Sequence, residues 1–259
     1  MPTAAQQRAL RNVRHLLERI RSQSEPNGPP GATPPISSAG IVGAGLMGAS
    51  IAAVHLRHAV PAVVYDLDPQ MLASASRRIA EQMAAYDPQP SPPPDGWQPQ
   101  LTTSDSLQAA AACDLVVECI VESFPAKSAL LVQLEPLLGE QAVLVSNTST
   151  IPIGRLGAVL TRPERFCGFH FCHPVPQRPL VEIVRGPKTC DRTVARLLAH
   201  AKRIGRIAIV VHDGPGFVVN RLLFPLVVEA LDLLLEGASI QAIEQASAEF
   251  GWSKGPLRL

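Results

Sequence analysis

The stretch Ala39–Ser50, AGIVGAGLMGAS, decides the fold of this 259-residue chain. Its first four residues form an apolar run that predicts a short buried strand, and residues 46–58 carry the pattern of a helix. Between them lies a G-x-G-x-x-G sequence made by Gly43, Gly45 and Gly48. The first glycine permits a tight turn, the second lets the backbone approach a pyrophosphate, and the third allows close packing of helix on strand. This unit predicts a dinucleotide-binding loop.

An acidic residue lies where a dinucleotide-binding unit needs one. The apolar run Ala62–Tyr65 predicts a second strand, and Asp66 follows it, 18 residues after Gly48. A carboxylate at this place binds both ribose hydroxyls and repels a 2′-phosphate. No arginine follows Asp66 immediately, so the sequence predicts NAD rather than NADP as the cofactor. The alternative interpretation is a glycine-rich turn that holds no ligand.

Beyond this unit, strand-like runs alternate with helical patterns as far as residue 211, and only helical patterns follow. Further strands are expected at Leu115–Cys119, Ala142–Ser146 and Ile207–Val211. Helices are expected at Leu46–His58, Pro69–Ala85, Pro125–Leu138, Pro152–Leu160, Asp191–Ile204, Phe217–Glu236 and Ser239–Phe250. Repeated β-α-β units predict an α/β fold with a Rossmann-type, doubly wound, mostly parallel sheet and a short all-helical domain after it. We place the boundaries at 1–37 for an N-terminal segment, 38–213 for the dinucleotide-binding domain and 214–259 for a partial helical domain.

The composition limits the classes of function. The chain is 46% hydrophobic with a formal net charge of +1, so bulk charge favours neither nucleic acid nor an anionic membrane as a partner. Its apolar stretches are too short or too interrupted to span a bilayer. The five cysteines show no C-x-x-C spacing, which is typical of reduced thiols in a cytoplasmic protein.

The N-terminal segment has its own pattern. Residues 8–21 alternate arginines with apolar residues, as a basic amphipathic helix does, and residues 26–35 (PNGPPGATPP) form a linker. The segment is either a short solvated helix or a mitochondrial transit peptide, which would place the protein in the matrix.

The segment Arg165–Val184, RFCGFHFCHPVPQRPLVEIV, carries the candidate chemistry. His170 and Glu182 lie in two strand-like runs joined by a prolyl loop, so an antiparallel turn would bring them side by side. A carboxylate beside an imidazole fixes its tautomer and raises its basicity, as a general base requires. The alternative is a hydrogen-bonded core histidine without a catalytic role.

The same segment holds four residue types that bind zinc: Cys167, His170, Cys172 and His173. On a strand, alternation places His170 and Cys172 on one face and the other two on the opposite face. Four ligands from this strand cannot converge, so we expect no metal site.

Five sequence blocks together resemble the L-3-hydroxyacyl-CoA dehydrogenase family over residues 40–256. They are IVGAGLMG (41–48), DLVVECIVESFPAK (114–127), SNTST (146–150), GFHFCHPVPQRPLVEIVRG (168–186) and DGPGFVVNRLL (213–223). The resemblance implies NAD-dependent oxidation of a 3-hydroxyacyl-CoA thioester to the 3-keto form, or the reverse reduction, within fatty acid β-oxidation.

The resemblance also implies roles for individual residues. His170 matches the family's catalytic base and Glu182 its orienting partner, while Ser149 matches a residue that hydrogen-bonds the substrate oxygen. Asn220 matches an amide that helps to hold the reacting group; the alternative is an amide that only caps or pairs a helix. The positions that line the nicotinamide half of the cofactor are matched by Glu122, Lys127 and Asn147. For Lys127 the alternative is a solvated charge on a helix.

Three features depart from the family pattern. His173 stands where the family usually has asparagine, and the proline-rich residues 86–99 stand where many members carry a helical arm that contacts CoA. The chain also stops at Leu259, where the family continues through helices that complete the second domain and the dimer interface. Apolar residues such as Leu226, Leu231 and Leu234 then either need a partner or stay exposed. A homodimer through these helices is the partner that we expect.

These departures keep two other functions open. One is a dehydrogenase of another 3-hydroxy acid or of a carrier-bound acyl group. The other is a truncated dinucleotide-binding protein without turnover.

Overall fold

The computed structural model describes residues 34–86, 96–252 and 255–258. The basic N-terminal pattern and most of the proline-rich loop therefore lie outside the described residues. Among these residues, 34–86 and 96–215 form one compact unit and those from Gly216 onward form a second. The division falls two residues after the predicted end of the dinucleotide-binding domain.

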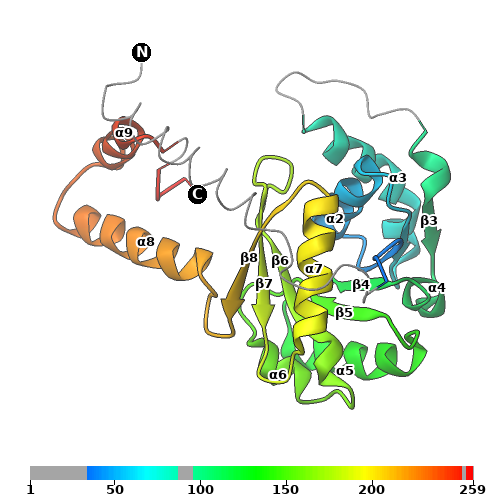
Figure 1. The fold of residues 1–259 in the computed structure, drawn as a ribbon. Helices are drawn as coiled ribbons and strands as arrows, with labels where there is room; N and C mark the ends of the chain where they lie inside the picture. The colour runs from blue at the N-terminus through cyan, green and yellow to red at the C-terminus, as the bar shows by residue number, and fades with distance from the viewer. Residues whose placement is uncertain (1–33, 87–95, 253–254, 259) are drawn as a thin grey trace. The chain divides into compact units, whose positions relative to one another are not determined.

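The larger unit is built on one eight-stranded sheet with the strand order β3-β2-β1-β4-β5-β6-β7-β8 (Figure 1). The strands are β1 (Ala39–Val42), β2 (Ala62–Tyr65), β3 (Leu101–Ser104), β4 (Leu115–Glu118), β5 (Val143–Ser146), β6 (Phe166–Phe171), β7 (Leu180–Arg185) and β8 (Ile207–His212). Strands β1 to β6 run parallel, β7 is antiparallel to β6, and β8 is parallel to β7. The predicted Rossmann-type, mostly parallel sheet is confirmed.

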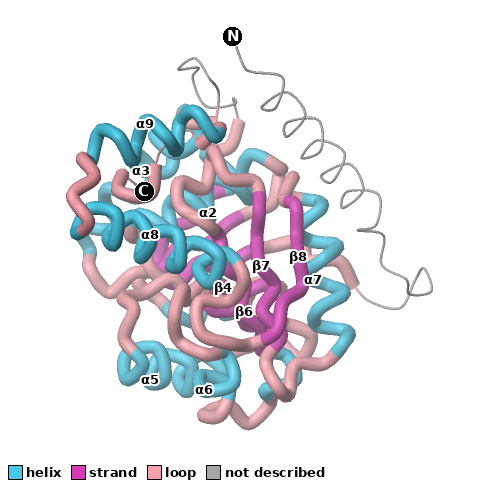
Figure 2. The backbone as a smooth tube through the Cα atoms, turned by 90° about the vertical axis from the view of Figure 1, so that its left-hand side faces the viewer, coloured by secondary structure: helices cyan, strands magenta, loops and turns pink. Residues whose placement is uncertain are grey.

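Helices cover both faces of the sheet (Figure 2). They are α2 (Leu46–Arg57), α3 (Pro69–Ala84), α4 (Leu107–Ala111), α5 (Phe124–Leu134), α6 (Ile153–Gly157) and α7 (Asp191–Arg203). Apolar side chains of α2, α3 and α7 share the main buried core with alternate residues of the strands. On the other face α4 packs so closely on β1 that a Cβ at Gly40 would lie 2.0 Å from the carbonyl oxygen of Ala110.

The sequence patterns locate the buried elements well and miss the edge. The strand β3 and the helix α4 were not predicted, because β3 reads LTTS with no buried residue and α4 has only five residues. The helix predicted at Pro125–Leu138 ends at Leu134, and Pro136 lies in a following 3₁₀ turn, Glu135–Leu137. A proline cannot donate the backbone hydrogen bond that would continue the helix.

The second unit consists of α8 (Val219–Leu235) and α9 (Ile240–Phe250), which contact each other. Ser239 caps α9 by accepting a hydrogen bond from the Ala242 N–H, and Gly251 ends it with φ +118°. Within the described residues, no helix is long and apolar enough to cross a membrane.

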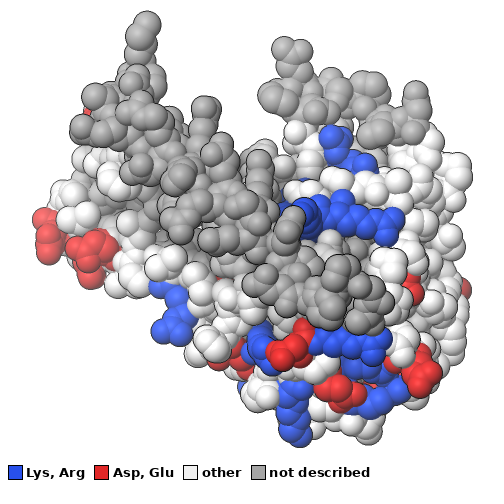
Figure 3. Space-filling view, in the orientation of Figure 1, with Lys and Arg blue, Asp and Glu red and all other residues white. Residues whose placement is uncertain are grey.

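Charged side chains of both signs are interspersed on the face of the larger unit that Figure 3 shows. This distribution agrees with the small net charge of the chain.

Candidate active site

The candidate residues of the larger unit gather where the parallel strands end. Val42 pairs with Tyr65 and with Glu118, and Glu118 pairs with Ser146, so β1, β2, β4 and β5 finish at one edge of the sheet. Ligands of open α/β sheets bind outside this carboxyl edge. The glycine loop follows β1, Asp66 follows β2, Glu122 follows β4, and Ser149 follows β5.

The three glycines of the loop have different surroundings. Gly43 has φ +110°, and a Cβ there would lie 2.8 Å from the carbonyl oxygen of Cys119. A Cβ on Gly48 would lie 1.8 Å from the carbonyl oxygen of Gly43. A Cβ on Gly45 would meet no described atom within 4 Å. Gly43 and Gly48 are thus required by the turn and its packing, whereas Gly45 faces open space.

This geometry suits the phosphates and the ribose of a dinucleotide. Gly45 is the N-cap of α2, and within the described part of the chain no side chain caps this helix and no acid occupies its first turn. The N–H groups and the positive end of the helix dipole are therefore directed at the open space. The Asp66 carboxylate accepts hydrogen bonds from the Ala44 N–H (2.7 Å) and the Asp68 N–H (3.0 Å), one on each oxygen. Each carboxylate oxygen keeps further acceptor capacity for a hydroxyl.

The predicted side-by-side placement of His170 and Glu182 is present. The two residues are directly paired across the antiparallel strands β6 and β7. Nδ1 of His170 lies 2.7 Å from Oε2 of Glu182, whose side chain is fully buried. The carboxylate accepts the Nδ1 proton, so the neutral imidazole carries its basic lone pair on Nε2. This is the tautomer that a general base uses when its second nitrogen faces the substrate.

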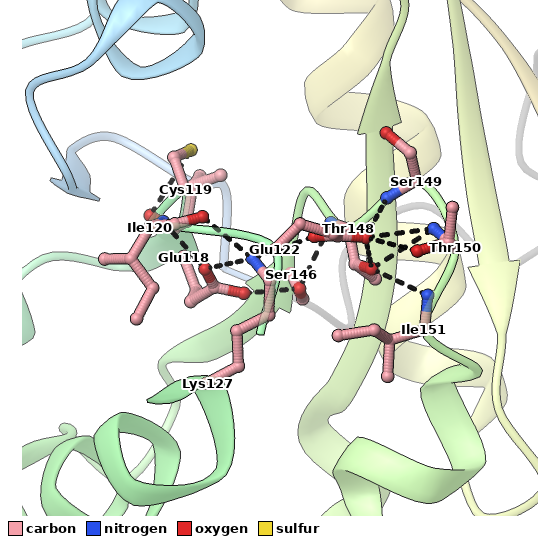
Figure 4. A network of polar contacts seen from close by, with 11 residues as sticks. Glu118, Cys119, Ile120, Glu122, Lys127, Ser146, Thr148, Ser149, Thr150 and Ile151 are labelled. Atoms are coloured by element: carbon pink, nitrogen blue, oxygen red, sulfur yellow. Dashed lines mark hydrogen bonds and ion pairs between the residues drawn. The ribbon is translucent and has the colours of Figure 1, made fainter. Parts of the chain in front are cut away.

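Ser149 lies in a turn that Glu122 organises (Figure 4). Oε1 of Glu122 accepts hydrogen bonds from Thr148 Oγ1 (2.5 Å), the Ser149 N–H (3.0 Å) and both Oγ1 and N–H of Thr150 (2.9 and 3.0 Å). Burial alone raises the pKa of Glu122, but these hydrogen bonds and the charge of Lys127 outweigh burial and hold its pKa below the usual value. The anionic carboxylate thus fixes the backbone that presents Ser149.

Lys127 is buried, with only 1% of its surface exposed, so the alternative of a solvated helix charge is wrong. Its Nζ lies 2.5 Å from Oε1 of Glu118, 3.2 Å from the carbonyl oxygen of Ile120 and 3.4 Å from Oε2 of Glu122. Glu118 is itself fully buried, and its Oε2 accepts a hydrogen bond from Ser146 Oγ (2.5 Å). Lys127 therefore joins the ends of β4 and β5 to the turn of Ser149.

Two other candidate residues lie in different places. Asn147 accepts a hydrogen bond from the Phe171 N–H on Oδ1 (2.8 Å), which ties the end of β5 to the residue after His170. Asn220 is the second residue of α8 and belongs to the C-terminal unit, where its N–H donates to the carbonyl oxygen of Gly216 (3.1 Å). Its role toward the reacting group stays a prediction. His173 is exposed in the loop after β6.

Sequence reasoning missed Glu118 and Asp213. Asp213 accepts hydrogen bonds from the N–H groups of Ile153 (2.8 Å) and Gly154 (2.7 Å), so it caps the helix that follows the turn of Ser149. Both acids end or directly follow a strand. An acid at the end of an apolar run was the signal available for each.

Known proteins resemble this chain in both parts. Residues 38–214 match the family described as 3-hydroxyacyl-CoA dehydrogenase, NAD binding domain, and residues 216–259 match its C-terminal domain. The α subunit of the fatty acid oxidation complex of Colwellia psychrerythraea is 46% identical over 160 residues, which are 61% of this chain. The match spans only 22% of the length of that relative.

Two solved structures are also similar. The (S)-3-hydroxybutyryl-CoA dehydrogenase of Ralstonia eutropha is 34% identical with a TM-score of 0.77, covering 86% of this chain and 80% of that one. The 3-hydroxybutyryl-CoA dehydrogenase of Escherichia coli is 31% identical with a TM-score of 0.78, covering 86% of this chain and 48% of that one.

Proposed function

This chain belongs to the 3-hydroxyacyl-CoA dehydrogenase family, and on that premise we propose that it catalyses NAD-dependent oxidation of a 3-hydroxyacyl-CoA to the 3-ketoacyl-CoA, or the reverse reduction. The observation that carries the proposal is the contact of 2.7 Å between His170 and a fully buried Glu182. It supplies a base of defined tautomer at the edge of the sheet where the dinucleotide loop also lies.

His170 moves the proton. In the oxidation, Nε2 takes the proton of the substrate hydroxyl while the bond between carbon and hydrogen breaks. NAD, when bound, accepts the hydride from that carbon. Glu182 stabilises the positive charge that develops on the imidazole, because the carboxylate is buried and hydrogen-bonded to Nδ1. In the reduction the imidazolium returns the proton to the oxygen.

Ser149 and Asn220 orient the reacting oxygen in this proposal. A hydroxyl and an amide can both donate a hydrogen bond to an oxygen that gains negative charge. The four hydrogen bonds that Glu122 accepts keep the turn of Ser149 in one conformation, which supports a positioning role. Lys127 then acts indirectly, by holding Glu122 and Glu118, and Asn147 by tying β5 to β6.

The cofactor would be held by the glycine loop and Asp66, and we keep the prediction that Glu122, Lys127 and Asn147 line its nicotinamide half. The open space at Gly45 and the uncapped start of α2 suit the pyrophosphate, and Asp66 suits an unsubstituted ribose. We keep the predicted domain limits, 38–213 and 214–259, as part of the proposal. We also keep the prediction that the protein forms a homodimer through its C-terminal helices. Exposed apolar residues of these helices include Leu222 and Leu235 (74% and 87% exposed).

The test is NADH oxidation with acetoacetyl-CoA as the substrate, comparing the wild type with His170→Gln. We expect turnover to fall by about 10²–10⁴ while the affinity for NADH, measured by fluorescence titration, stays within about twofold. Equal losses of both would remove His170 from the role of base. NADH binding without turnover on any 3-hydroxyacyl-CoA or 3-ketoacyl-CoA would overturn the proposed function.

The substrate class has a separate test. Activity on free 3-hydroxybutyrate but none on its CoA ester would show that the substrate is a free 3-hydroxy acid and not a CoA thioester. Measuring both substrates on one enzyme sample excludes differences in folding between preparations.

A further inference from the structure

Three possible metal donors of different chemistry, one of them the proposed base His170, lie close together. The ligand atoms of His170, Cys172 and Glu182 all lie within 4.8 Å of one another, and all three residues are buried. His170 and Cys172 are two positions apart, so they lie on the same face of the extended chain. Glu182 is the direct cross-strand partner of His170 on β7. The strand of His170 alone cannot bring enough ligands together, but the third donor comes from the neighbouring strand β7.

This donor set has the chemistry of a zinc site. Zinc binds imidazole nitrogen, thiolate sulfur and carboxylate oxygen, and three protein ligands with a fourth open position are common. Bond lengths of about 2.0–2.3 Å place tetrahedral donors about 3.3–3.7 Å apart. The histidine nitrogen and the glutamate oxygen are 2.7 Å apart because they share a proton. To bind one ion together, these two atoms must move apart by up to about 1 Å.

The charges also balance. Cys172 can bind a metal ion only as the thiolate, so its thiol must give up a proton. Zn²⁺ binding replaces that proton, and one proton leaves for each ion bound. A dication with one thiolate, one carboxylate and a neutral imidazole has no net charge, which suits a buried position.

Metal binding and base catalysis exclude each other. An ion on Nδ1 displaces the proton there, and the neutral ring then carries its proton on Nε2, which can no longer accept one. An ion on Nε2 occupies the same lone pair directly. We propose that His170, Cys172 and Glu182 form a Zn²⁺ site whose occupation switches off the base. The inhibitory effect rests on the proposed function, whereas the binding of the ion does not.

The test uses Co²⁺ as a spectroscopic substitute for zinc in the full chain, without substrate. We expect one equivalent of Co²⁺ to bind with a thiolate-to-cobalt charge-transfer absorption in the near ultraviolet, and Zn²⁺ to displace it because zinc binds such sites more tightly. Cys172→Ser and Cys172→Ala should both lose this absorption. Cys190→Ser, at a cysteine in the N-cap of α7, is the matched control and should keep it.

Inhibition is measured next, with each variant compared with its own metal-free rate. Zn²⁺ should lower the turnover of the wild type and of Cys190→Ser, and EDTA should restore it. Cys172→Ser should need more than about tenfold more Zn²⁺ for the same inhibition. A wild type that shows no charge-transfer absorption, or an absorption that survives in both Cys172 variants while their circular dichroism is native, overturns the site. Because that readout needs no turnover, it fails independently of the proposed function.

Discussion

Two buried pairs of an acid and a base lie near the carboxyl edge of the sheet, and they differ in what their protons do. The Lys127 ammonium has three partners on its own chain, one for each of its protons. In the other pair, Glu182 accepts a hydrogen bond from Nδ1 of His170, and the proposed reaction uses the second ring nitrogen. A pair whose donors are all used holds loops in place, whereas a pair that includes a titratable ring can exchange a proton with a substrate. Burial by itself therefore does not identify a catalytic pair.

The largest expected effect comes from breaking the contact of His170 with Glu182, the proposed catalytic pair, by substituting Glu182. In Glu182→Gln the buried amide can donate to Nδ1, which moves the ring proton to Nε2, and it supplies no charge for the imidazolium. We expect turnover with acetoacetyl-CoA to fall by about 10³–10⁴. NADH affinity should change by less than about twofold. A loss below tenfold would mean that the carboxylate neither orients nor stabilises the ring.

Breaking the other buried pair, Lys127 with Glu118 (the structural pair), should instead lower the stability of the fold. Lys127→Met leaves the fully buried Glu118 carboxylate without its cation, and we expect a loss of about 3–5 kcal/mol in the free energy of unfolding by urea. The matched control is Arg77→Met, which removes one end of an exposed pair with Glu81 at 3.4 Å. The control should change stability by less than about 1 kcal/mol. Similar losses in the two variants would contradict a special role for the buried cation.

A third buried pair contains two histidines and no carboxylate, so its contribution to stability depends on pH. His55 on α2 and His200 on α7 lie with their Nε2 atoms 3.0 Å apart, and burial lowers their pKa values to about 4 and about 2. In the unfolded chain these two histidines take up protons near pH 6.5, whereas in the folded protein they stay neutral at that pH. Their contribution to stability is therefore present above pH 6.5 and is lost as the pH falls below it.

The size of this pH effect follows from about 1.4 kcal/mol for each pH unit and each histidine. Between pH 6.5 and pH 5 we expect the free energy of unfolding to drop by about 3 kcal/mol from these two groups. His200→Leu should roughly halve that slope in urea titrations at several pH values. A slope unchanged by the substitution would assign the pH dependence to other groups.

The smallest expected effect tests the turn of Ser149. Thr150→Val removes one hydrogen bond to the Glu122 carboxylate and keeps the shape of the side chain, so stability should fall by about 1 kcal/mol. Thr161→Val is the matched control, because Thr161 makes the same kind of bond to Glu135 (2.8 Å). Both variants should lose similar stability in urea. Only Thr150→Val should also lower kcat, and equal kinetics in the two would separate the turn from the chemistry.

The contact of His170 with Glu182 was predictable because its geometry is local. Glu182 is the twelfth residue after His170, and an antiparallel turn through the prolyl loop between them places the two side chains together. The glycine loop and Asp66 were predictable for the same reason, since one β-α-β unit contains them.

The structural pair was not predictable in the same way. Glu118 and Lys127 are only nine residues apart, but Lys127 lies on a helix, and Glu118 also contacts Ser146, 28 residues away on the next strand. Periodicity along a strand and the following helix does not tell which of these side chains face each other. The polar strand β3 was missed because the hydrophobic periodicity of a sequence reveals only strands with a buried face, and no residue of this edge strand is buried.

Asp213 has a mechanical consequence for the molecule. Its carboxylate accepts hydrogen bonds from the first turn of α6, which follows the turn of Ser149. The end of β8 is thereby fixed to the start of α6. The next residues are Gly214, Pro215 and Gly216, and Gly216 has φ +71°. A substitution at Asp213 would therefore act at two places at once, the exit of the chain from β8 and the start of the helix that follows the turn of Ser149.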